Sequence, residues 1–160
     1  MNFSASDPPL LRLDHVSRTL AGRPVVRELE LEAHRGEVLG LLGVNGAGKS
    51  TTLRMVAGVL APSAGMVRLD GADLYEAPEL ARRRIGYLPE EAPLHDELSV
   101  VEYLRFCGRL RGLSRPAANA AVDREIQRCD LGEVRWRLIG QLSKGFRQRV
   151  GLAQALLHAP

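Results

Sequence analysis

A short glycine-rich segment constrains the fold of this chain more than any other feature. Residues 43–50 read GVNGAGKS and fit the pattern G-x4-G-K-[ST]. The apolar run at residues 38–42 comes directly before this segment, and a helical pattern begins at Lys49. A buried strand running into the pattern and a helix running out of it are the usual setting of a phosphate-binding loop. The sequence therefore predicts an α/β fold built around such a loop.

Each residue type in this loop suits contact with a nucleoside triphosphate. The glycines let the backbone curl until several N–H groups face one phosphate, and the positive end of the following helix adds to the attraction. Lys49 offers a mobile cation to the β- and γ-phosphates, Ser50 offers a hydroxyl to Mg²⁺, and Thr51 can bond the α-phosphate. The alternative interpretation is a plain glycine-rich turn with an incidental lysine. The predicted nucleotide-binding residues are Gly43, Val44, Asn45, Gly46, Ala47, Gly48, Lys49, Ser50 and Thr51.

Hydrophobic patterning divides the chain into a β-rich part and a helical part. Residues 1–9 form a polar tail that we expect to be flexible. Period-two and continuous apolar runs predict strands at residues 10–16, 25–33, 38–42, 66–69 and 85–88, and Asp70-Gly71 predicts a tight turn. Helical spacing predicts helices at 49–59, from 78, from 100, from 115 towards 129, and from 143 onwards, where Ser143 is a good N-cap. The β-rich part thus covers residues 10–89, and the helical stretch runs from about 95 to 158.

Composition excludes several other classes of protein. The net charge of +3 is too mild to indicate a nucleic-acid partner. Cys107 and Cys129 lack the spacing of a metal site and are read as free thiols. No basic and apolar leader stands at the N-terminus, and no apolar run approaches the roughly 20 residues that span a bilayer. We expect a cytoplasmic protein, or one held peripherally on the cytoplasmic face of the membrane by a partner.

Two segments together resemble the motifs of ATP-binding-cassette (ABC) ATPases. Residues 40–52 are similar to the Walker A segment of this family, and residues 142–149, LSKGFRQR, resemble a variant of its signature motif. The resemblance implies a P-loop NTPase fold of α/β class, with an antiparallel β subdomain and a helical subdomain at about residues 91–142 of a domain covering 10–160. In the family, the signature motif of one subunit faces the γ-phosphate held by the other. By this resemblance the signature residues are Leu142, Ser143, Lys144, Gly145 and Phe146.

A third segment, residues 85–91, resembles the Q-loop that joins the two subdomains in this family. The position of the family's glutamine is Glu90 here. A carboxylate still suits Mg²⁺, so the predicted metal ligands are Ser50 and Glu90. The alternative is a junction with solvated carboxylates. The stretch from Ile85 to Val100 is most similar to exporters of the multidrug, gliding-motility and sodium-extrusion type.

The sequence also departs from the family's pattern. In the family, a strand that ends in the Walker B Asp follows the segment ALLHAP, and the catalytic Glu and the switch His come later. None of these residues occurs in the 160 residues. We therefore expect this chain alone to bind ATP and not to hydrolyse it, and we expect apolar surface to be exposed on the neighbours of that central strand. Leu20 takes the place of the aromatic that stacks on adenine.

The resemblance implies a function and leaves alternatives open. It implies an ATP-binding subunit of a membrane exporter that takes ATP and Mg²⁺ as cofactors, pairs head to tail with a second ATPase subunit, and contacts a permease. One alternative is a nucleotide-binding remnant without catalysis. Another is a soluble ABC-type ATPase that acts on nucleic acid or ribosomes, against which the mild charge and the exporter-like segment argue.

Overall fold

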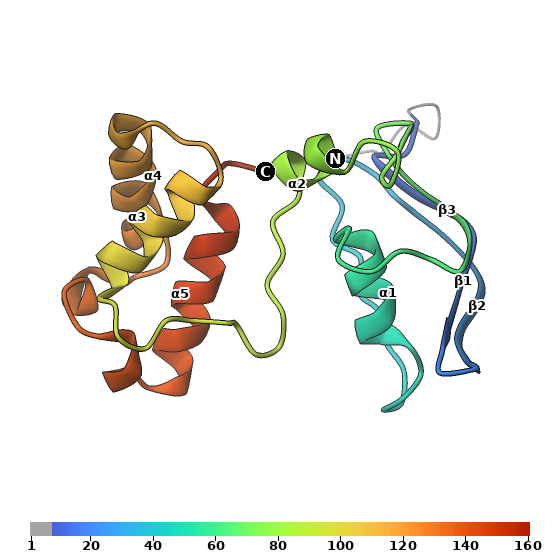
Figure 1. Ribbon diagram of the computed structural model, residues 1–160, viewed down its shortest axis with the longest axis horizontal. Coiled ribbons are helices and arrows are strands. Elements are labelled where there is room, and N and C mark those ends of the chain that lie inside the picture. Colours follow the sequence, from blue (N-terminus) through green and yellow to red (C-terminus); the bar gives the residue numbers. More distant parts are fainter. Residues whose placement is uncertain (1–7) are drawn as a thin grey trace. The chain divides into compact units, whose positions relative to one another are not determined.

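The computed structural model describes the backbone of residues 8–160 and the side chains of these residues apart from 80–82. Residues 1–7 of the expected flexible tail lie outside the described part. The chain divides into two compact units, Met1–Arg82 and Arg83–Pro160 (Figure 1). The second unit begins upstream of the helical subdomain expected at about 91–142, and it also contains the final helix.

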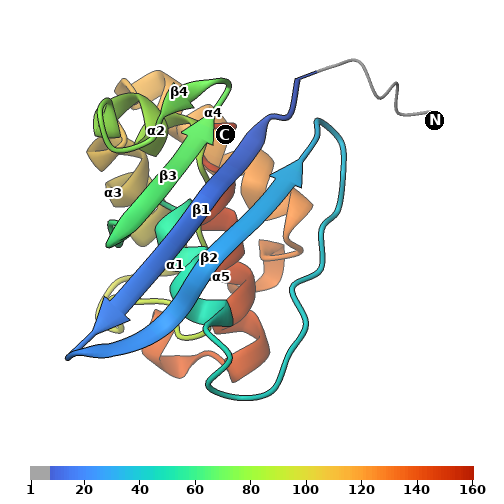
Figure 2. The ribbon, with the colours of Figure 1, turned by 90° about the vertical axis from the view of Figure 1, so that its right-hand side faces the viewer.

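A four-stranded antiparallel sheet forms the frame of the first unit (Figure 2). Its order is β2-β1-β3-β4, and all three neighbouring pairs are antiparallel. A tight turn at Asp70-Gly71 joins the last two strands, and both turn residues have positive φ, 49° and 79°. This turn was predicted from the sequence. The strands are β1 (Leu11–Leu20), β2 (Arg23–Ala33), β3 (Ala64–Leu69) and β4 (Ala72–Asp73).

Helix α1 (Lys49–Val56) covers one face of this sheet (Figures 1 and 2). It is shorter than the predicted helix at 49–59, because Ala57 ends it and Gly58 follows with a φ of 70°. Helix α2 (Pro78–Arg84) starts at the predicted proline. The apolar core of the unit consists of Leu13, Val16, Val26, Met55, Val67 and Leu74.

The predicted strand at residues 38–42 is absent from the structure. Within the described residues, 8–160, no strand pairs with this segment. A strand forms only when a neighbour bonds its N–H and C=O groups, so an apolar sequence alone does not make one. The side chains of Val38 and Leu42 are 97% and 94% exposed. The predicted strand was therefore wrong, and these apolar side chains of the segment are exposed.

Three helices pack around the core of the second unit: α3 (Val100–Leu110), α4 (Arg115–Arg128) and α5 (Lys144–Leu156). Serine N-caps begin all three, because a serine hydroxyl accepts a backbone N–H that the first turn leaves unbonded. Two short 3-10 helices, Gly132–Val134 and Ile139–Gln141, lead from α4 to α5. The helices begin close to the residues predicted from sequence.

The predicted strand at residues 85–88 is also absent. This segment has no strand partner among the described residues and instead packs along α5. A Cβ atom added at Gly86 would lie 2.5 Å from the carbonyl oxygen of Ala155, and one added at Gly151 would lie 2.7 Å from Cδ1 of Leu88. Two glycines therefore let the backbone lie directly against the helix, and the side chains of Ile85, Tyr87 and Leu88 are half-buried.

Candidate functional site

The phosphate loop connects the extended segment before Gly43 to the first turn of α1. The N–H of Ala47 donates to the carbonyl oxygen of Val44 over 3.2 Å, which closes a turn at the tip of the loop. Gly46 and Gly48 have φ values of 86° and 87°, a conformation that other residues rarely adopt. The structure thus brings all nine predicted nucleotide-binding residues into one loop and one helical turn.

Gly48 fixes the loop to the sheet. It is buried and is the N-cap of α1, and a Cβ atom there would lie 2.7 Å from the carbonyl oxygen of Val25 and 3.0 Å from Cγ2 of Val26. Only a residue without a side chain allows β2 and the helix start to approach so closely. The sheet therefore determines where the loop begins its helix.

The ammonium group of Lys49 folds back over the loop. Its Nζ donates to the carbonyl oxygens of Gly43 and Val44 over 2.7 and 2.8 Å. These bonds hold the cation beside the loop, with one N–H left for another acceptor. Ser50 is exposed and Thr51 is half-buried in the same helical turn. No acidic residue lies in the first turn of α1, so nothing there opposes an anion.

The other end of α1 is held by Tyr75. Its hydroxyl oxygen lies 2.6 Å from the carbonyl oxygens of both Met55 and Leu60, so the single hydroxyl proton serves two acceptors. Burial, the largest cause, raises the pKa of Tyr75 to about 12. The sequence analysis did not single out this residue, because its partners are backbone atoms that only the fold brings near.

The predicted signature residues lie together at the start of α5 in the second unit. Ser143 is the N-cap, and its hydroxyl accepts the N–H of Phe146 over 3.4 Å. Gly145 lies in the first turn, and a Cβ atom added there would meet nothing within 4 Å. The helix end is therefore open, and its first turn carries no acidic residue. Such an end attracts anions in the same way as the start of α1.

Glu90 lies in the segment that packs along α5. It is exposed, and its carbonyl oxygen accepts the side-chain N–H of Gln148 over 3.1 Å. The segment of Glu90 is thus bonded to the helix that follows the signature residues. Ser50, the other predicted metal ligand, belongs to the first unit. Within the described residues, no three acidic, histidine or cysteine side chains gather as a metal-binding group.

A comparison with known protein families matches residues 26–160 to the family described as ABC transporter. The chain belongs to the ABC transporter family. Among its curated relatives is the ABC transporter ATP-binding protein NatA of Bacillus subtilis (strain 168), 42% identical over 136 residues, which are 84% of this chain and 55% of that protein. The Nod factor export ATP-binding protein I of Cupriavidus pinatubonensis (strain JMP 134 / LMG 1197) is 37% identical over 94% of this chain and 46% of its own length. The chain spans about half the length of these curated relatives.

Solved structures agree with the family and confirm the predicted α/β fold of ABC ATPases. The structure of an ATP binding subunit of an ABC transporter matches 94% of this chain and 63% of its own length, with 31% identity and a TM-score of 0.82. The structure of cbiO1 from Clostridium perfringens shares the fold at 24% identity, with a TM-score of 0.83, over 96% of this chain and 63% of that one.

Two residues of α5, Arg147 and Gln148, make contacts that sequence reasoning missed. Arg147 donates to the carboxylate of Asp96 over 2.6 Å and to the carbonyl oxygen of Ile139 over 3.2 Å. Gln148 bonds Glu90, as described above. Both residues belong to the motif read in the sequence as LSKGFRQR, so their place beside the signature residues was the available signal. Two of their partners, Asp96 and Glu90, lie 51 and 58 residues away in sequence, so only the fold brings them beside the signature helix.

Loss of the signature N-cap should destabilise the start of α5. We expect Ser143→Ala to lower the free energy of unfolding of the second unit by about 1 kcal/mol, because the N–H of Phe146 loses its acceptor. Thermal unfolding and amide hydrogen exchange in the first turn of α5 measure this. Ser143→Asn keeps an N-cap acceptor and should stay near the parent protein. A loss as large in the Asn variant would contradict the role of the cap.

Proposed function

We propose that this chain binds MgATP through its phosphate loop and works within the ATP-binding subunit of an ABC-type membrane exporter. The observation that carries the proposal is the loop itself, with Gly48 packed against β2 and Lys49 held over the loop by two carbonyl oxygens. The backbone of the loop is already curled, and it lies beside a cation and a helix N-terminus that has no acidic residue in its first turn. Such a loop needs little rearrangement to accept a triphosphate.

Each residue of the loop then has a role in this proposal. The backbone N–H groups of residues 43–48 surround the β-phosphate, and Lys49 moves from its carbonyl partners to the β- and γ-phosphate oxygens. Thr51 bonds the α-phosphate side. The open start of α5, with Ser143 and Gly145, faces the γ-phosphate of a second subunit in a head-to-tail pair.

The donor atoms proposed for Mg²⁺ are oxygens, which this ion prefers. Ser50 has an exposed hydroxyl at the start of α1, and Glu90 has an exposed carboxylate on the segment bonded to Gln148. The residues present therefore fit the ion, which when bound would neutralise charge on the β- and γ-phosphates. In this proposal, the hydroxyl of Ser50 would be a ligand of the ion, and the carboxylate of Glu90 would be a ligand directly or through water.

Hydrolysis requires a Walker B carboxylate and a group that orients water. Asp123 and Asp130, on α4 and just after it, do not follow an apolar strand, so they do not replace that carboxylate. We therefore propose that the 160-residue chain, assayed by itself, binds ATP without turning it over. Steady-state phosphate release of about 0.1 per second or more, lost in Lys49→Ala, would refute this part of the proposal.

The proposed partner is a membrane permease, with the chain on the cytoplasmic face and without a nucleic-acid partner. One relative is named for Nod factor export, and cbiO1 is described as part of an ABC transporter complex. Among the described residues, none of the helices is long and apolar enough to cross a membrane. Co-purification with a multi-span membrane protein would support the proposal, and co-purification with RNA would favour an ATPase that acts on nucleic acid.

The first test is MgATP binding by the purified chain, measured with a fluorescent nucleotide. The proposal expects saturable binding that unlabelled ATP displaces and that AMP displaces far less, because the loop contacts the β- and γ-phosphates. Chelation of Mg²⁺ should weaken binding. Binding that AMP displaces as well as ATP would mean that the base and ribose are recognised without the phosphate loop.

A further inference from the structure

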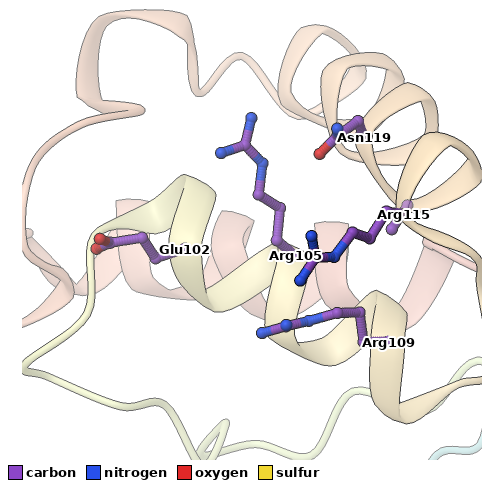
Figure 3. Close-up of a pocket in the computed structure, with 6 residues that line it drawn as sticks. Glu102, Arg105, Arg109, Arg115 and Asn119 are labelled. Atoms are coloured by element: carbon purple, nitrogen blue, oxygen red, sulfur yellow. The ribbon is translucent and has the colours of Figure 1, made fainter.

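A pocket on the helical unit gathers three arginines that the proposed ATP site does not use (Figure 3). It has a volume of about 330 Å³, at the lower end of the range for small-molecule sites. Arg105 and Arg109 come from successive turns of α3, and Arg115 is the first residue of α4. The lining residues are Glu102, Arg105, Arg109, Arg115, Ala118 and Asn119.

The three guanidinium groups bring more positive charge to the pocket than its carboxylate balances. Within the described residues, none of them donates a hydrogen bond or forms an ion pair with another side chain. In Figure 3 the side chains of Arg109 and Arg115 extend in the same direction from α3 and α4, and that of Arg105 extends away from Arg109. Like charges on neighbouring side chains repel each other, and an anion between them would turn this repulsion into attraction.

Glu102, the acidic residue of the lining, balances part of this charge, since its carboxylate and the guanidinium group of Arg105 attract each other. Its carboxylate accepts the backbone N–H of Ser99 over 2.9 Å and the hydroxyl of Ser99 over 2.5 Å, as the capping box of α3. These two hydrogen bonds lower the pKa of Glu102 and keep its carboxylate at the helix start. In Figure 3 this side chain points away from Arg109 and Arg115. The pocket thus keeps an excess of two positive charges.

We propose that this pocket binds the phosphate group of an anionic ligand, separately from the ATP site. Guanidinium groups are planar, weakly hydrated and matched to phosphate oxygens in pairs. Three of them from two helices suit a tetrahedral dianion better than a planar carboxylate, since each can reach a different edge of the tetrahedron. The carboxamide of Asn119 adds a further donor, and Ala118 leaves room for the ligand because it is small and buried. A soluble phosphate compound and a phospholipid headgroup share this chemistry.

The test titrates inorganic phosphate into the chain at constant ionic strength and follows the side-chain amide of Asn119 by NMR. The chain carries Lys49→Ala, so that the phosphate loop does not compete for the ion. We expect a saturable shift that chloride does not reproduce. Arg109→Gln should weaken binding about tenfold, because one charge-assisted pair is lost. The matched control Arg137→Gln removes one charge from an exposed residue of the same unit outside the pocket and should change affinity less than twofold.

A second arm separates the two sources of phosphate. Phosphatidylcholine vesicles that contain phosphatidic acid are sedimented with the parent chain, with Arg109→Gln and with Arg137→Gln. Sedimentation that depends on Arg109 assigns a lipid headgroup, and phosphate binding without such sedimentation assigns a soluble compound. The proposal is overturned if Asn119 shows no saturable shift, or if Arg137→Gln weakens phosphate binding as much as Arg109→Gln does.

Discussion

Replacing Lys49 by alanine is expected to weaken MgATP binding by about 10- to 100-fold while leaving the fold intact. The lysine contributes hydrogen bonds to charged oxygens, each worth about 1.5–3 kcal/mol, and each 1.4 kcal/mol is a factor of ten in affinity. In the structure its Nζ donates two hydrogen bonds, to the carbonyl oxygens of Gly43 and Val44. Binding exchanges two neutral acceptors for phosphate oxygens, so part of the gross interaction is lost in the exchange.

A matched control comes from the other end of the same helix. Arg54 is exposed in the last turn of α1, so Arg54→Ala removes one positive charge without touching the loop. Fluorescent-nucleotide titrations of both variants separate a specific contact from a general effect of charge. An equal loss of affinity in both would mean that Lys49 acts only through net charge, and the proposed role of its ammonium group would be abandoned.

The reactivity of the lysine side chains provides a second test of the same prediction. Lys49 and Lys144 are its two lysines, one in the phosphate loop and one in the signature segment. MgATP should protect Lys49 from an amine-acylating reagent and leave Lys144 reactive at low protein concentration. Protection of both lysines that rises with protein concentration is the result expected of the head-to-tail pair. Protection of Lys144 alone would contradict the assignment of the loop.

The local parts of this fold were predictable, because the signals that produce them are local. Serine before a helical pattern predicted the start of α5, and Asp70-Gly71 predicted the turn between β3 and β4. The phosphate loop was found for the same reason, since its glycines and Lys49 stand within a few residues of one another. Periodicity and capping act over one or two turns of chain, which a sequence displays directly.

The predictions that were wrong concern segments whose structure depends on residues far away in the sequence. The runs at residues 38–42 and 85–88 have strand-like composition, but one lacks a paired neighbour among the described residues and the other packs on α5.

The burial of Glu125 also depends on packing that the sequence does not display. It lies on the predicted helix, yet it is fully buried, and its carboxylate accepts from Arg124 over 2.7 Å and from Arg128 over 3.2 Å. Charge and period alone do not predict which polar residue the packing encloses.

The close approach of Gly48 to β2 leads to the largest expected effect on stability. Gly48→Ala should lower the free energy of unfolding of the first unit by about 2–4 kcal/mol. Alanine at a φ of 87° costs about 1–2 kcal/mol by itself, and its Cβ would lie 2.7 Å from the carbonyl oxygen of Val25, so strand and helix must separate. Because the chain has two units, hydrogen exchange of amides in β1 and β2 is the appropriate measurement.

Gly46 supplies the control that separates these two costs. Its φ is 86°, nearly that of Gly48, but a Cβ atom there would meet nothing within 4 Å. Gly46→Ala should therefore show only the backbone cost of about 1–2 kcal/mol. The difference between the two variants measures the contact of the helix start with β2. If both destabilise equally, the contact with Val25 relaxes freely, and the sheet does not hold the phosphate loop in the way described above.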